Sequence, residues 1–219
     1  MTRTGMDDWI AALYAQPDLL RMGHQQRAED LNLGLGWIYY GLARIVRPAR
    51  VVVVGSWRGY TPLVFGRALQ DNVETGEVIF IDPSLVDDFW ADPARVRAHF
   101  AGLGVHNVRH VRMTTAQFRE SGGVATLDPV GLVLIDGYHT AEQARIDFET
   151  FEPLLAPEAI VLLHDSVAVG ESRRYGPGRE YVRDVVRYVD ELRARADLQV
   201  FDLPFGAGLT LVRKTAHAG

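Results

Sequence analysis

The sequence contains no cysteine, which excludes disulfide bonds, thiolate metal sites and cysteine nucleophiles. It also lacks the run of about 18 apolar residues that a membrane-spanning helix needs. Acidic residues and a proline stand in the N-terminal region, where a signal peptide would have its apolar run. These absences lead us to expect a cytoplasmic protein without a membrane partner.

A surplus of positive charge is missing as well, because the net charge is −5 at pH 7. The composition therefore gives no electrostatic reason to expect a nucleic-acid partner. Apolar residues make up 47% of the chain and charged residues 23%, as in ordinary soluble domains. At roughly 150 residues per domain, the 219 residues predict one main domain over 49–215 and an N-terminal helical segment over 1–48.

Short runs rich in β-branched residues alternate with stretches of helical pattern. The expected strands cover 50–54, 77–81, 107–111, 130–135 and 159–163. Several of these runs are apolar without alternation, which is typical of strands buried on both faces of a parallel sheet. The expected helices between them cover 61–69, 93–103 and 140–155. This order predicts an α/β fold built from βαβ units with right-handed crossovers.

The two ends of the chain add further elements. Apolar residues at helical spacing predict a helix over 25–46 and another over 179–194. Two short runs, 199–203 and 209–213, flank a glycine-containing turn and predict a hairpin. Such a hairpin would complete a sheet of seven strands, the last of them antiparallel to the others.

A glycine turn follows the first expected strand, with Gly55 and Gly59 on either side of Ser56, Trp57 and Arg58. Glycine permits positive φ angles and a close approach of ligand to backbone, and the next helix offers free N–H groups. The dinucleotide fingerprint is incomplete because Trp57 occupies a glycine position, which argues against a nicotinamide-dependent oxidoreductase. A purely structural turn is the alternative.

Asp82 ends the second expected strand, a little over 20 residues after the glycine turn. A carboxylate at this place suits the hydroxyls of a ribose, because it accepts hydrogen bonds from both. A helix cap or turn former is the alternative reading of a single aspartate. The glycine turn and Asp82 together indicate a nucleotide-type ligand.

Carboxylates and histidines follow the fourth and fifth expected strands, at Asp136, His139, His164 and Asp165. Neighbouring parallel strands deliver their ends to one rim of the sheet, where ligands bind in open α/β folds. Such groups hold a hard divalent cation or supply a general base. Magnesium suits two carboxylates, whereas zinc prefers more histidine. The alternative is that each aspartate caps the next element.

The segment 165–178 has no periodicity and is long for a loop, which favours a lid or a binding role. It contains Arg173, Arg174 and Tyr175, which suit an acidic or aromatic substrate. A solvated surface loop is the alternative.

Three stretches read VVVVGSWRGYTPLVFGRAL, GEVIFIDP and VGLVLIDGYHTAEQARIDFETFEPLLAPEAIVLLHDS. Together, over roughly 50–167, they resemble the class I S-adenosylmethionine (SAM)-dependent methyltransferases. The resemblance extends to small-molecule O-methyltransferases whose fourth strand ends in Asp-Gly-x-His and whose fifth ends in His-Asp. It implies a Rossmann-like sheet of order 3-2-1-4-5-7-6 with helices on both faces, and a SAM-binding domain over 49–215.

The resemblance also implies cofactor contacts at the ends of the first four strands. The glycine turn would line the methionine end, Asp82 would hold the ribose, and residues after the third strand would flank the adenine. The residues concerned are Gly55, Ser56, Gly59, Thr61, Asp82, Thr114, Thr115, Ala116 and Asp136.

A metal site follows from the same resemblance. Relatives similar to catechol O-methyltransferase bind Mg²⁺ with an aspartate after the fourth strand and an Asp-Asn pair after the fifth. Asp136 and Asp165 match two of these positions, but Ser166 stands where asparagine is expected. A second departure is Val53, where many relatives carry an acidic residue.

We therefore expect methyl transfer from SAM to an oxygen of a hydroxylated small molecule, with Mg²⁺ as a candidate helper. His139 or His164, beside Asp136, would take the hydroxyl proton. A non-catalytic cofactor-binding protein and a nicotinamide-dependent oxidoreductase are the alternatives, and N-methylation stays open. The N-terminal segment is expected either to cover the site or to form a homodimer contact.

Overall fold

The computed structural model describes residues 3–72, 75–127 and 129–215, and its centre is a seven-stranded sheet. The strand order is β3-β2-β1-β4-β5-β9-β8, with β9 antiparallel to both of its neighbours. The strands are β1 Arg50–Val54, β2 Glu77–Ile81, β3 Val108–Val111, β4 Val130–Ile135, β5 Leu155–His164, β8 Leu198–Leu203 and β9 Leu209–Lys214. This confirms the expected strand order. The last two strands are numbered β8 and β9 because a separate hairpin of strands β6 (Gly170–Ser172) and β7 (Tyr181–Arg183) precedes them in the chain.

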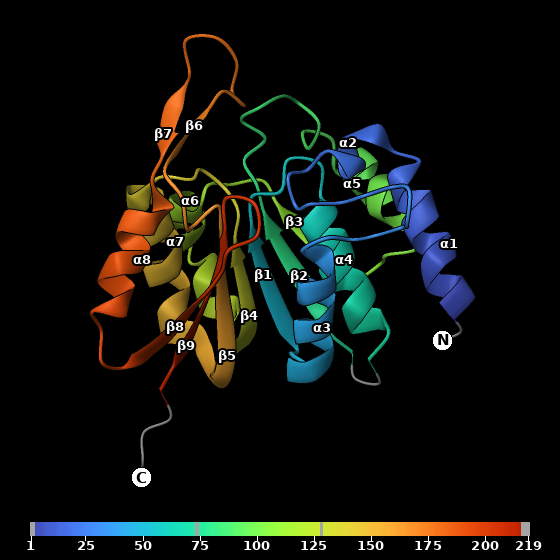
Figure 1. Ribbon diagram of the computed structural model, residues 1–219. Coiled ribbons are helices and arrows are strands. Elements are labelled where there is room, and N and C mark those ends of the chain that lie inside the picture. Colours follow the sequence, from blue (N-terminus) through green and yellow to red (C-terminus); the bar gives the residue numbers. More distant parts are fainter. Residues whose placement is uncertain (1–2, 73–74, 128, 216–219) are drawn as a thin grey trace.

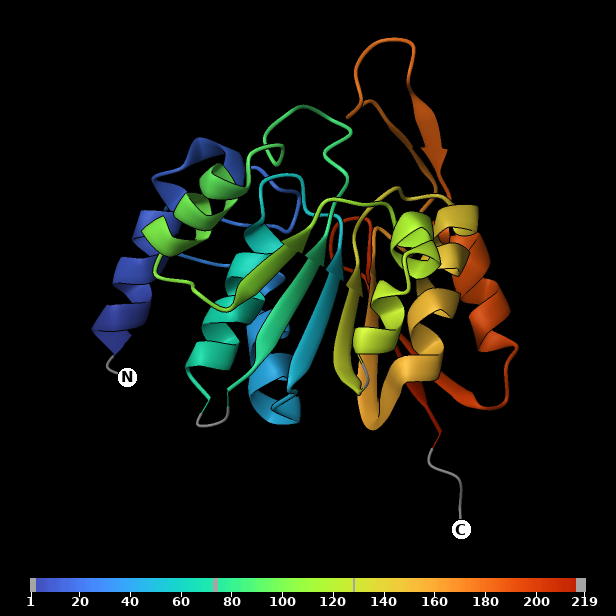
Figure 2. The same ribbon diagram turned by 180° about the vertical axis from the view of Figure 1, so that it is seen from behind.

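Helices cover both faces of the sheet, as Figures 1 and 2 show from opposite sides. One face carries α3 (Gly36–Val46), α4 (Tyr60–Gln70) and α5 (Pro93–Gly102), and the other carries α6 (Thr115–Glu120), α7 (Ala141–Phe151) and α8 (Val185–Arg193). The central strands are therefore apolar at successive positions. Val53, for example, lies between Phe80 and Leu134 and is fully buried in the core.

The N-terminal segment contains α1 (Arg3–Tyr14) and α2 (Pro17–Leu20), followed by a loop. The helix predicted over 25–46 is wrong in its first part, because α3 begins only at Gly36. Gly34 adopts φ +58°, and a Cβ there would lie 2.1 Å from the carbonyl oxygen of His24. The amide of Leu35 donates to that same oxygen at 2.8 Å. The chain thus doubles back on His24 instead of forming a longer helix.

Two further predicted helices have different limits. The stretch 179–194 begins as strand β7 (Tyr181–Arg183), which pairs with β6 (Gly170–Ser172) before α8 starts. The stretch 140–155 ends as helix α7 at Phe151, followed by a 3₁₀ turn, η2 (Glu152–Leu154). Pro153 has no N–H to continue the helix, so the chain turns directly into β5.

A second 3₁₀ turn, η1 (Gly123–Thr126), precedes β4. Among the described residues, no helix has both the length and the apolar character needed to cross a membrane.

Candidate functional site

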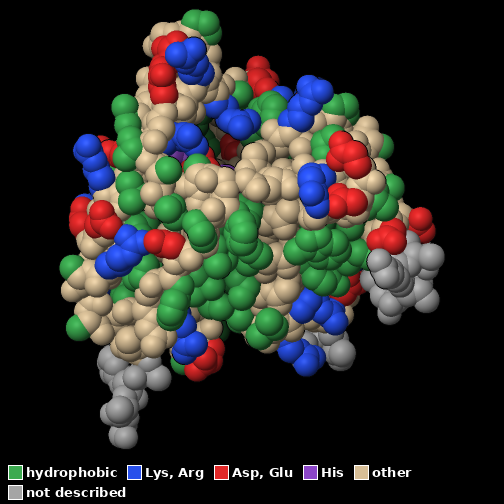
Figure 3. Space-filling view, in the orientation of Figure 1, with side chains coloured by type: hydrophobic (Ala, Val, Ile, Leu, Met, Phe, Trp, Pro, Cys, Tyr) green, Lys and Arg blue, Asp and Glu red, His purple; other side chains and the backbone are tan. Residues whose placement is uncertain are grey.

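A cavity of about 700 Å³ opens at the carboxyl ends of the central strands. This size lies in the usual range for small-molecule sites. Figure 3 shows a hollow at the base of the β6–β7 hairpin, with Lys or Arg side chains around it. The cavity extends from the glycine turn and Asp82 to Asp136, His139 and His164, so one space connects the two groups predicted from the sequence.

The glycine turn is shaped by close backbone approach. Gly55 has φ +71°, and a Cβ there would lie 2.4 Å from the Cα of Gly137. Only glycine fits this place without a shift of the chain. Ser56 lines the cavity, and its Oγ accepts a hydrogen bond from Thr61 Oγ1 at 2.8 Å. Gly59 and Thr61 are not among the described residues that line the cavity, and both donate hydrogen bonds to Ser56.

Asp82 lies buried at the end of β2 and lines the cavity. Its two carboxylate oxygens accept backbone N–H bonds from Ser84 at 2.7 Å and Ser56 at 3.3 Å. Burial raises the pKa of Asp82, and these two hydrogen bonds partly oppose that shift. Each oxygen keeps a lone pair for a further donor. Asp82 can therefore still accept hydrogen bonds from a ligand, and its role in binding ribose stays a prediction.

The loop after β3 forms another end of the cavity. Thr114 caps α6, and Thr114 and Thr115 line the cavity, whereas Ala116 is not among the described lining residues. Gln143 and Asp147 of α7 also line this end, and neither was predicted from the sequence.

Asp147 is a carboxyl group in an apolar helix face. It is fully buried, Gln143 Nε2 donates to its Oδ1 at 2.8 Å, and its Oδ2 has no hydrogen-bond partner among the described residues. Burial raises its pKa to about 6. A signal existed in the sequence, because Asp147 shares a core-facing stripe with Ala144, Phe148 and Phe151, where an acid is out of place.

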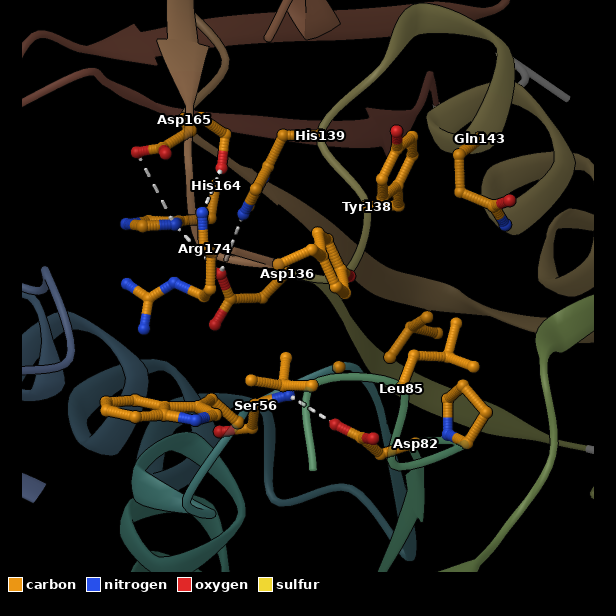
Figure 4. Close-up of a pocket in the computed structure, with 18 of the residues that line it drawn as sticks. Ser56, Asp82, Leu85, Asp136, Tyr138, His139, Gln143, His164, Asp165 and Arg174 are labelled. Atoms are coloured by element: carbon orange, nitrogen blue, oxygen red, sulfur yellow. Dashed lines mark hydrogen bonds and ion pairs between the residues drawn. The ribbon is translucent and has the colours of Figure 1, made fainter. Parts of the chain in front are cut away.

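Five side chains meet beside the opposite end of the cavity, and we call them the histidine–aspartate cluster: His24, Asp136, His139, His164 and Asp165. Of these, His24 lies behind the described residues that line the cavity. Figure 4 shows His139 and His164 directed at the Asp136 carboxylate. His164 Nδ1 lies 2.8 Å from Asp136 Oδ1, and His139 Nε2 lies 3.8 Å from the same oxygen. His24 Nε2 lies 3.3 Å from Asp136 Oδ2. Asp136 is thus the centre of the cluster.

The charges in this cluster are strongly coupled. Burial alone would raise the pKa of Asp136, but His164 and His24 outweigh burial and hold it well below its usual range. Burial alone would lower the pKa of His164, but Asp136 outweighs burial and raises it. Burial lowers the pKa of both His24 and His139. Asp136 is therefore an anion, and the rings of His24 and His139 are neutral at neutral pH.

His24 was missed from the sequence, because it lies in a loop without any motif. Its ring is fully buried, stacks on Tyr60 with ring centres 5.3 Å apart, and lies 4.3 Å from the ring centre of His164. Its Nδ1 lies 3.1 Å from the hydroxyl of Tyr39. The doubled-back loop before α3 brings it there, and only the tertiary structure reveals this.

The predicted magnesium ligands do not fit Mg²⁺ in this arrangement. Asp165 forms an ion pair with Arg183 of β7, and the Oδ1 of Asp165 lies 3.6 Å from His164 Nδ1. Ser166 is fully buried and shares a hydrogen bond of 2.7 Å with Thr210. The two aspartates therefore face nitrogen groups and a cation instead of forming an oxygen-rich site.

The β6–β7 hairpin forms one wall of the cavity. The rings of Tyr138 and Tyr181 stack with centres 3.9 Å apart, and Tyr175 lies 5.5 Å from Tyr138. The guanidinium of Arg174 lies 4.8 Å from the ring centre of Trp57. Arg173, Arg174 and Tyr175 all line the cavity, which places the predicted binding segment beside the site.

The family model described as a methyltransferase domain matches residues 52–166. The uncharacterized protein y4gI of Sinorhizobium fredii is 28% identical over 193 residues, which cover 84% of this chain and 20% of that protein. The chain thus spans about a fifth of the length of this curated relative.

Several solved structures have a similar fold. A protein from Corynebacterium glutamicum superposes with a TM-score of 0.66 at 20% identity, covering 95% of this chain and 92% of that one. The O-methyltransferase TomG from Streptomyces achromogenes, in complex with SAM, gives 0.61 at 20% identity, with coverages of 96% and 90%. An O-methyltransferase from Bacillus cereus, in complex with SAH (S-adenosylhomocysteine), gives 0.60 at 15% identity, with coverages of 98% and 93%.

Proposed function

Because the chain belongs to the methyltransferase-domain family, we propose that it transfers a methyl group from SAM to an oxygen of a hydroxylated small molecule. One observation carries this proposal: a single cavity joins the glycine turn and Asp82 to the histidine–aspartate cluster. The first part suits a nucleoside cofactor, and the second would supply acid–base groups to an acceptor bound beside it. TomG and the Bacillus cereus enzyme, solved with SAM and SAH, share the fold.

The residues present fit SAM. The backbone at Gly55 and Ser56, which lines the cavity, would hold the methionine part. Asp82 would accept hydrogen bonds from the ribose hydroxyls through its free lone pairs. At the other end, the unpartnered Oδ2 of Asp147 would accept a hydrogen bond from the amino group of adenine.

Bound SAM supplies an electrophilic methyl group, which a hydroxyl oxygen of the acceptor would attack in line with the leaving sulfur. The protein would position both partners and exclude water. His139 would take the proton of the hydroxyl, since its ring lines the cavity, is neutral, and keeps a lone pair. The products are SAH, the methyl ether and protonated His139, with Asp136 3.8 Å away to stabilise that charge.

Isothermal calorimetry with SAH and NAD tests the cofactor. We expect binding of SAH and none of NAD. Binding of NAD without SAH would contradict the proposal and favour a nicotinamide-dependent oxidoreductase.

Methyl transfer to a panel of catechols, sugars and polyketides, followed by mass spectrometry, tests the reaction. We expect His139→Ala to bind SAH like the wild type and to lose orders of magnitude in turnover. His164→Ala is the comparison, and a larger loss there would move the base to His164. Unchanged rates in both variants would contradict a histidine base. SAH binding without transfer to any acceptor would favour a non-catalytic cofactor-binding protein.

A further inference from the structure

We propose that His24, Asp136 and His164 form a binding site for a transition-metal ion of the Zn²⁺ type, in place of the Mg²⁺ expected from the sequence. The site lies beside the proposed acceptor position. It does not depend on the proposed methyl transfer, because ion binding can be measured without cofactor or acceptor.

The three side chains have the spacing of a metal site. One ligand atom from each lies within 4.8 Å of the other two. Zinc stands about 2.0–2.2 Å from nitrogen and carboxylate ligands, so neighbouring ligand atoms of a tetrahedral site are about 3.3 Å apart. His24 Nε2 lies 3.3 Å from Asp136 Oδ2, which equals this spacing, and His164 Nδ1 lies 2.8 Å from Asp136 Oδ1, which is shorter. Small adjustments would admit an ion.

Two of the ligand atoms lack hydrogen bonds. His24 Nε2 and His164 Nδ1 are buried, and neither has a partner in hydrogen-bonding geometry among the described residues. Both lie within ion-pair distance of the Asp136 carboxylate, which raises the pKa of His164, but neither meets the angular requirement of a hydrogen bond. A cation between the nitrogens and the carboxylate would give both nitrogens and the carboxylate a directed bond.

The surroundings of His24 agree with a metal ligand. Metal-bound histidine usually donates its second ring N–H to an oxygen, which fixes the tautomer. The Tyr39 hydroxyl, 3.1 Å from Nδ1, provides such an oxygen. In that tautomer Nε2 presents a lone pair to the Asp136 carboxylate, and two acceptors face each other. In the other tautomer the N–H at Nε2 is misaligned with the carboxylate.

The donor set selects the ion. Two imidazole nitrogens and one carboxylate suit zinc and related transition metals, whereas Mg²⁺ prefers oxygen ligands. His139, His164 and Asp165 form a second trio that shares His164. We favour the trio with His24 because Asp165 is already paired with Arg183. Asp136 and His164 line the cavity, so an ion here would acidify a hydroxyl that reached it.

Calorimetric titration of chelator-treated protein with ZnCl₂ and with MgCl₂, without SAM or SAH, tests the site. We expect one Zn²⁺ per chain, bound at least tenfold more tightly than Mg²⁺. His24→Ala should weaken Zn²⁺ binding at least tenfold. His106→Ala is the matched control, because His106 is exposed and lies outside the cluster, and it should bind Zn²⁺ like the wild type.

Cobalt substitution gives a second readout. Co²⁺ held by nitrogen and carboxylate ligands in a low-coordinate site absorbs visible light, and we expect this band in the wild type and in His106→Ala. It should disappear in His24→Gln and in Asp136→Asn, which keep the side-chain volume if His24→Ala does not fold. Absence of Zn²⁺ binding, equal affinity for Mg²⁺, or wild-type Zn²⁺ binding by the folded His24 variants would overturn the proposal. SAH binding by the same samples reports separately on the proposed function.

Discussion

At the scale of single residues, the buried carboxyl of Asp147 makes the stability of the fold depend on pH. Its pKa rises from 3.8 to about 6 in the folded chain because burial disfavours the charged form. The folded state therefore binds more protons than the unfolded state between these values, and stability falls as the pH rises from about 4 to about 6. The shift corresponds to about 3 kcal/mol at higher pH.

Asp147→Asn should therefore be more stable than the wild type by about 3 kcal/mol at pH 8, with no difference below about pH 4. The amide oxygen keeps the hydrogen bond from Gln143, so the titration is what changes. Urea unfolding of the ligand-free protein across this pH range measures the effect. In the same variant SAH should bind about tenfold more weakly, since a charge-assisted hydrogen bond is lost. Unchanged SAH affinity would show that Asp147 does not contact the adenine.

Gly55 and Gly104 form a matched pair, because both have φ +71°. Gly55→Ala should lose SAH binding and cost several kcal/mol in unfolding free energy, since its Cβ would lie 2.4 Å from Gly137. Gly104→Ala meets nothing within 4 Å and should show only the cost of a left-handed conformation, about 1–2 kcal/mol. Calorimetry and chemical unfolding compare them. Equal losses in both variants would mean that close approach at Gly55 is unimportant.

At the scale of elements, the β6–β7 hairpin connects the cavity wall to the cluster. Tyr181 stacks on Tyr138, and the backbone N–H of His139 donates to the Tyr181 hydroxyl at 3.4 Å. Tyr181→Ala should raise the KM for the acceptor several-fold, because the aromatic wall beside the proposed acceptor position is lost. The affinity for SAH should stay unchanged. Val182→Ala is the control, since Val182 is 56% exposed on the same strand. A change in SAH affinity alone would assign the hairpin to cofactor binding.

The elements predicted from the sequence were those with strong local patterns. The apolar runs of β1, β4 and β5 were correctly predicted as strands, because a strand buried on both faces needs apolar residues at successive positions. The prediction that the helix begins at 179 was wrong, because Val182 fits the apolar stripe of a helix but lies exposed on strand β7. The prediction of a helix over 25–35 was wrong, because the spacing of hydrophobic residues does not reveal the turn at Gly34.

At the scale of the whole molecule, topology made much of the site predictable. Parallel strands bring Asp82, Asp136 and His164 to one rim, and the sequence order of the strands was sufficient to infer this. The contributions of His24 and Asp147 were not predictable in the same way. His24 depends on how the N-terminal loop folds back, and the role of Asp147 depends on which face of α7 meets the cavity.

Ligand binding should stabilise the whole fold if SAH binds only the folded state. At 100 times its Kd, SAH should add about 2.7 kcal/mol to the unfolding free energy. For a domain of this size the melting temperature should rise by about 5–10 °C. Differential scanning fluorimetry measures this, with Gly55→Ala as the variant that should show no shift. An equal shift in that variant would place SAH elsewhere.

In the proposed metal site, the fold-back at Gly34 joins donor atoms from two parts of the chain. The shared methyltransferase domain, matched over 52–166, supplies Asp136 and His164, while His24 comes from a separate segment that precedes it. Exchanging the loop that carries His24 would alter the donor atoms around Asp136, while every strand of the sheet comes from other parts of the chain. Two proteins with the same central domain would then differ in the ion they select, and the difference would lie in residues that a comparison of their shared domains never aligns.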